Sequence, residues 1–65
     1  MSFRERQLLR LRELLQQLLQ LQEQLEWCQD DVANEYLADS ILRDLEQCRR
    51  ICLSLKLPER MPLAN

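Results

Sequence analysis

The fold is decided by residues 28–42, which read CQDDVANEYLADSIL. Before this stretch, apolar residues recur at alternating steps of three and four, which is typical of a helix packed along another helix. Continued with the same spacing, this stripe would place Glu35 and Asp39 on the apolar face, so the pattern breaks there. The first stripe comprises Leu11, Leu14, Leu18, Leu21, Leu25 and Cys28.

A second apolar stripe follows in a different phase. In one continuous helix, one of the two stripes would face water, whereas a chain reversal brings them together. We therefore predict an all-α antiparallel helical hairpin over residues 1–57, with helices over about 3–28 and about 35–56 and a turn over about 29–34. The second stripe comprises Ala38, Ile41, Leu45, Cys48, Cys52 and Leu55.

The rest of the chain agrees with two long helices. Between Ser2 and Leu57 there is no glycine and no proline, and good helix formers supply most positions. Pro58 and Pro62 each lack a backbone N–H, and Pro58 biases Leu57 away from helical geometry. We expect residues 58–65 to form an extended tail.

The turn region carries candidate helix caps and two aromatic residues. Asp30, Asp31 and Asn34 can each cap the second helix with a side-chain oxygen. Trp27 and Tyr36 flank the turn, and we expect them to pack together with their polar tips in water. The alternative is that they are exposed anchors for a partner.

Size and composition restrict the class of protein. A 65-residue monomer buries only about 60% of the surface that its unfolded chain exposes, so self-association is expected. Three cysteines and no histidine argue against a disulfide framework and against the commoner zinc sites. No run approaches the ~20 apolar residues of a membrane span. We predict a cytoplasmic protein with reduced thiols and no cofactor.

The first helix has more leucine than one neighbour requires. Nine leucines lie between positions 8 and 25. We expect Leu8, Leu15 and Leu19, beside the main stripe, to face a second neighbour, most simply in a homodimer of hairpins that forms a four-helix bundle. The predicted dimer or partner interface comprises Leu8, Leu11, Leu14, Leu15, Leu18, Leu19, Leu21, Leu25, Ile41, Leu45, Cys48, Cys52 and Leu55.

Charge is unevenly distributed along the predicted hairpin. The formal net charge is −2, but the chain ends are basic and the turn end is acidic. A head-to-tail dimer would place each basic end beside the partner's acidic turn. Alternatively, the basic end contacts nucleic acid, which would make binding sensitive to salt. The candidate anion contacts are Arg4, Arg6, Arg10, Arg12, Arg49 and Arg50.

Other polar and sulfur groups receive a structural interpretation. Cys48 and Cys52 share a helix face and could form a metal or redox pair, but we favour core positions for both. The chain has no histidine and no glycine loop, and its carboxylates give no sign of burial, so we expect no catalysis. A polar flank of the first helix, expected to face solvent, comprises Gln16, Gln17, Gln20 and Gln24.

The predicted organisation, a hairpin of about 60 residues with a short tail, resembles two families. It is similar to the plasmid RNA-binding Rop-type proteins, which implies a four-helix bundle that binds RNA on its first helices. It also resembles the small helical-hairpin co-chaperones of type III secretion systems, which implies an amphipathic face laid against a larger partner. The first helix carries glutamine and leucine, not basic residues, in its middle. We therefore predict a non-enzymatic protein–protein interaction module that self-associates and docks a partner helix, with an RNA-binding regulator as the alternative.

Overall fold

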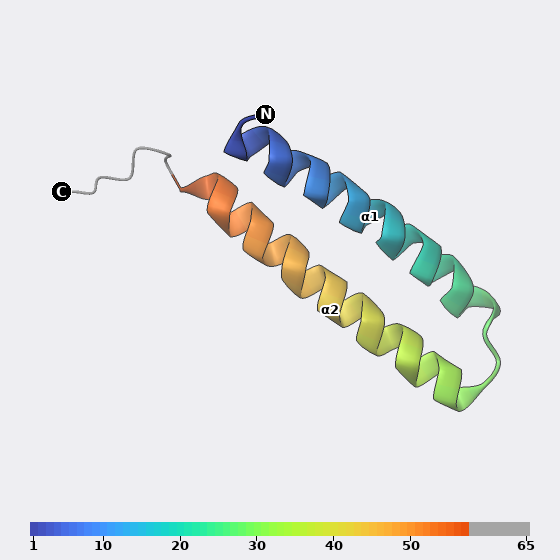
Figure 1. Ribbon diagram of the computed structural model, residues 1–65. Helices are drawn as coiled ribbons and strands as arrows, with labels where there is room; N and C mark the ends of the chain where they lie inside the picture. The colour runs from blue at the N-terminus through green and yellow to red at the C-terminus, as the bar shows by residue number, and fades with distance from the viewer. Residues whose placement is uncertain (58–65) are drawn as a thin grey trace.

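The computed structural model describes residues 1–57, which form two antiparallel α-helices joined by a short turn (Figure 1). Helix α1 spans Phe3–Trp27 and helix α2 spans Asp31–Lys56. The start of α1 and the end of α2 lie at the same end of the hairpin, which we call the open end (Figure 1). The all-α hairpin is thus confirmed. The tail predicted for residues 58–65 lies outside the described residues.

Both helices begin with a side-chain cap. Ser2 Oγ accepts a hydrogen bond from the Glu5 backbone N–H (3.1 Å), and Glu5 Oε1 accepts one from the Ser2 backbone N–H (2.9 Å). This reciprocal capping box satisfies two donors that the first turn leaves free. At α2, Asp30 Oδ2 accepts from the Ala33 N–H (2.8 Å). Of the three candidate caps in the turn region, Asp30 is the one used.

The turn is shorter than expected. Residues 28–30 connect the helices, and α2 begins at Asp31, four residues before the expected boundary near 35. The cap on Asp30 explains the difference, because it allows the helix to start immediately. Asn34 lies within the first turn, where its backbone N–H donates to the Asp30 carbonyl (2.8 Å).

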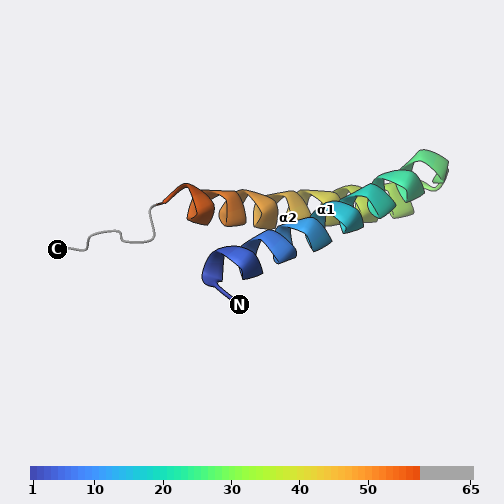
Figure 2. The same cartoon turned by 90° about the horizontal axis from the view of Figure 1, so that it is seen from above.

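The helices meet along a seam of buried and half-buried side chains at steps of three and four. Leu14, 2% exposed, is the one fully buried side chain of residues 1–57, and it packs with Cys48 and Ile51. Figure 2 shows the two helices crossing at a small angle, as heptad packing requires. The seam comprises Gln7, Leu11, Leu14, Leu18, Leu21 and Leu25 from α1, Cys28 directly after α1, and Leu37, Ile41, Asp44, Cys48, Ile51 and Leu55 from α2.

On α2 the predicted stripe was wrong by one residue at alternate positions. The seam contains Leu37, Asp44 and Ile51, and the neighbouring residues 38, 45 and 52 are exposed. In the seam, Leu37 and Ile51 bury more apolar surface than Ala38 and Cys52 would in their place. This phase buries the carboxylate of Asp44 in the seam, so the expectation that no carboxylate is buried was wrong. Asp44 is only 7% exposed, and it is stabilised by a hydrogen bond from Gln17 across the seam.

Candidate interaction surfaces

One side of the helix pair is polar, and side-chain hydrogen bonds join α1 to α2 there. Gln17 is exposed, as expected, and its side-chain amide also donates to Asp44. Gln17, Arg10, Gln47 and Ser54 each precede a seam residue by one position, so these residues of both helices lie on the same side of the pair. The three side-chain hydrogen bonds between the helices within residues 1–57 run from Gln7 to Ser54 (3.0 Å), from Arg10 to Gln47 (3.0 Å) and from Gln17 to Asp44 (2.8 Å).

The opposite side of the pair carries a set of apolar residues. One step along an α-helix rotates the side chain by about 100°. Because the residues before the seam positions share the polar side, the residues after them share the other side. Seven of these are leucine, alanine or cysteine, and we call them the leucine face: Leu8, Leu15 and Leu19 on α1, and Ala38, Leu42, Leu45 and Cys52 on α2.

The hairpin leaves the leucine face open to solvent. Its leucines keep between 42% (Leu8) and 63% (Leu42) of their surface exposed. Of the predicted interface residues, Leu8, Leu15, Leu19, Leu45 and Cys52 lie on this face. The other eight lie in the seam of the hairpin itself: Leu11, Leu14, Leu18, Leu21, Leu25, Ile41, Cys48 and Leu55. The sequence analysis missed Ala38 and Leu42 as members, because it placed Ala38 in the second stripe and assigned Leu42 to neither the stripe nor the interface.

The six arginines proposed as anion contacts all lie toward the open end, but several have partners within the hairpin. Arg10 pairs with Glu13 (3.8 Å) on the polar side. Arg49 and Arg50 lie 3.6 Å and 3.3 Å from Glu46. The Arg6 guanidinium donates to the carbonyl of Met1 (3.3 Å). These pairs are exposed and individually weak. Arg4 and Arg12 are also exposed, and Arg12 follows Leu11 on the side of the leucine face.

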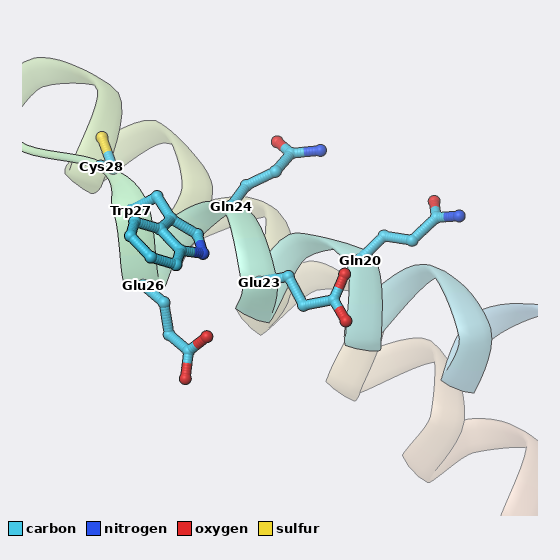
Figure 3. Close-up of a pocket in the computed structure, with 6 residues that line it drawn as sticks. All are labelled: Gln20, Glu23, Gln24, Glu26, Trp27 and Cys28. Atoms are coloured by element: carbon cyan, nitrogen blue, oxygen red, sulfur yellow. The ribbon is translucent and has the colours of Figure 1, made fainter.

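The turn end exposes two aromatic residues. Trp27 and Tyr36 are 83% and 67% exposed, so the expected packing of one on the other is wrong. Trp27 precedes Cys28 and Tyr36 precedes Leu37, so both residues lie beside the seam and not in it. Figure 3 shows the indole ring of Trp27 on the outside of the last turn of α1, with Gln24 nearby and Gln20 further along the helix, both pointing away from the ribbon. The shallow hollow here is lined by Gln20, Glu23, Gln24, Glu26, Trp27 and Cys28.

The three thiols have different environments. Cys48 is buried in the seam, whereas Cys52 is exposed on the leucine face, so the core position predicted for Cys52 is wrong. Cys28 is half-buried, and its thiol donates to the Asp30 carbonyl (3.5 Å). Within residues 1–57, no group of three or more histidine, cysteine or acidic residues is placed to hold a metal ion.

Burial raises the pKa of the Cys48 thiol above its ordinary value of 9.0, and repulsion from Cys52 and Asp44 raises it further. Folding therefore favours the neutral thiol. Its contribution to stability is complete below pH 9.0 and is lost as the pH rises through the folded pKa. We expect the free energy of unfolding to fall in this alkaline range, and to fall less in Cys48→Ala. Urea titrations at a series of pH values, followed by circular dichroism, measure this.

The matched control is Cys52→Ser, which changes an exposed thiol on the same helix. It should keep most of the alkaline loss of the wild type. An identical alkaline slope for Cys48→Ala and the wild type would contradict the assignment of this loss to Cys48.

Neither helix of the described chain contains a stretch long and apolar enough to cross a membrane. Comparison of the chain with protein-family models, with curated proteins and with solved structures gives no match.

Proposed function

We propose that this chain is a non-enzymatic protein–protein interaction module, a small helical adaptor or assembly factor that self-associates and docks a partner helix. The leucine face is the observation that carries the proposal. It gathers exposed apolar residues on one side of the hairpin, while the hydrogen bonds between the helices lie on the other side.

The free energy of burying exposed leucine surface favours a partner that covers the leucine face. Fully burying a leucine side chain is worth about 1.5–3 kcal/mol. The five leucines of the face are each about half exposed, so covering them would contribute roughly 1 kcal/mol apiece. Two helices also make a single layer, and stable domains pack at least two. A partner layer on this face would supply what the hairpin lacks.

The shape of the face favours a helical partner. It runs lengthwise along both helices, from Leu8 to Leu19 on α1 and from Ala38 to Cys52 on α2. A helix laid along such a face can contact it with residues spaced three and four apart, the usual mode of helix docking. The exposed indole of Trp27 lies outside this face, and tryptophan is a residue type that often dominates binding energy. It offers a second contact for an adaptor whose leucine face is already covered.

A photo-crosslinking experiment tests the proposal. A photoreactive phenylalanine analogue replaces Leu15 on the leucine face, or Gln16 on the outer surface one position further, and the full chain is irradiated in the cells that make it. We expect protein adducts from position 15 and few or none from position 16. Equal adducts from both positions, or no protein adduct from position 15, would refute the proposal. The mass of the adduct separates a second copy from another chain.

A further inference from the structure

We infer that the partner on the leucine face is a second copy of this chain, with the two hairpins running head to tail in a twofold-symmetric four-helix bundle. The inference depends on the proposed interaction function and names its partner.

Charges flank the leucine face with opposite sign at its two ends. Toward the open end, Arg12, Arg49 and Lys56 each follow a seam residue and so share the side of the face. Toward the turn end, Glu26 and Glu35 each follow a half-buried residue and lie on the same side. All five are exposed. The charges on this side are therefore basic toward the open end, where they alternate with Leu8 and Cys52, and acidic toward the turn end.

Glu5 also lies near the open end. Its carboxylate accepts the hydrogen bond from the Ser2 N–H in the capping box, which holds it at the helix start. It therefore reduces the positive charge of this end without reversing the polarity of the face.

Four leucines of the face lie midway along the hairpin. Leu15 and Leu19 on α1 are level with Leu45 and Leu42 on α2, because Gln17 bonds to Asp44 and Leu14 packs with Cys48 across the seam. A twofold axis through this region, perpendicular to the helices, places leucine on leucine. It also places the basic part of each face over the acidic part of its partner.

This self-complementarity indicates a copy of the chain as the occupant. A twofold contact uses the same patch on both partners, so that patch must complement itself after rotation. The leucine face does so in the head-to-tail orientation, where opposite charges meet. With the hairpins parallel, Arg12 and Arg49 would meet the partner's arginines, and the glutamates would meet glutamates, which costs affinity.

A charge exchange tests both the partner and the orientation. The variant Arg12→Glu/Glu26→Arg/Glu35→Arg/Arg49→Glu has the composition of the wild type with the polarity of the face reversed. In a head-to-tail dimer, wild type and variant each pair with themselves, but a mixed pair opposes like charges. In a parallel dimer the mixed pair is the favoured one. Circular dichroism checks that the variant is helical.

Wild type uniformly labelled with ¹⁵N is mixed with the unlabelled variant and studied by native mass spectrometry at low salt. Random pairing would put half of the dimers in the mixed form. We expect the mixed form to be reduced several-fold below this proportion, and to recover at high salt as charges are screened. A mixed form at or above random, or a wild type that is monomeric, would overturn the inference.

The wild type alone gives an independent measurement that needs no variant. In light scattering coupled to size exclusion, a head-to-tail dimer should dissociate more readily at high salt, and a parallel dimer less readily. A monomeric wild type would refute the second copy as partner, while adducts of position 15 with a different chain would still support the interaction function.

Discussion

Leu14→Ala should cost about 2–5 kcal/mol of unfolding free energy, enough to unfold most of the hairpin at low protein concentration. Leu14 is 2% exposed, and it packs with Cys48 and Ile51 at the centre of the core. Truncation removes buried apolar surface and leaves a cavity that two straight helices close poorly. Because whole domains are stable by only about 5–15 kcal/mol, so small a core has little in reserve. Urea titration followed by circular dichroism measures the loss.

Leu9→Ala is the matched control. Leu9 is on the same helix and 43% exposed, and it belongs neither to the seam nor to the leucine face. Its truncation should change the free energy of unfolding by less than about 1 kcal/mol. Both variants must be compared at one protein concentration, since self-association contributes to apparent stability. Equal losses in the two variants would contradict a core centred on Leu14.

The seam of α1 could be predicted from sequence because only one phase fits its apolar residues. Leu11, Leu14, Leu18, Leu21 and Leu25 keep a regular spacing, and every one of them is buried or half-buried. The break of this pattern in residues 28–42 also predicted the chain reversal. Local sequence was sufficient here, because a stripe of leucines has a single way to face another helix.

The phase of α2 could not be predicted in the same way. Apolar residues occupy adjacent positions, as at Leu37 and Ala38 or Ile51 and Cys52, so two phases are almost equally apolar. The phase that avoids Asp44 is the more attractive by hydrophobicity alone. The phase adopted is the one that buries Leu37 and Ile51, and the hydrogen bond from Gln17, 27 positions away in sequence, offsets part of the cost of burying Asp44. No local pattern contains this contact.

The first helix cap could also be recognised from local sequence, whereas the exposure of the aromatic residues could not. The sequence signature of a capping box, a serine followed three residues later by a glutamate, is present at Ser2 and Glu5 and could have been recognised. The exposure of Trp27 and Tyr36 was not predicted, because proximity to the turn does not show that each residue precedes a seam position and so lies beside the seam.

Asp44→Leu should raise the free energy of unfolding by roughly 1–4 kcal/mol, although it removes a hydrogen bond. Burying a carboxylate costs desolvation that one bond from Gln17 offsets only in part, whereas leucine would pack against the apolar seam. The same change should broaden the range of assemblies, because a polar position in a seam restricts helix register and the number of helices that associate. Urea titration measures stability, and light scattering measures the distribution of masses.

Asp39→Leu is the control, because it removes the same charge from an exposed position of α2 and should leave both measurements nearly unchanged. A less stable Asp44→Leu variant would mean that the bond to Gln17 outweighs the desolvation of the carboxylate. A more stable variant with one sharply defined mass would mean that Asp44 has no part in setting register. A gain in stability together with mixed assemblies would show that Asp44 lowers stability but enforces one pairing of the helices. Contacts between leucines alone allow several registers, so a module that packs through leucines needs such a polar residue.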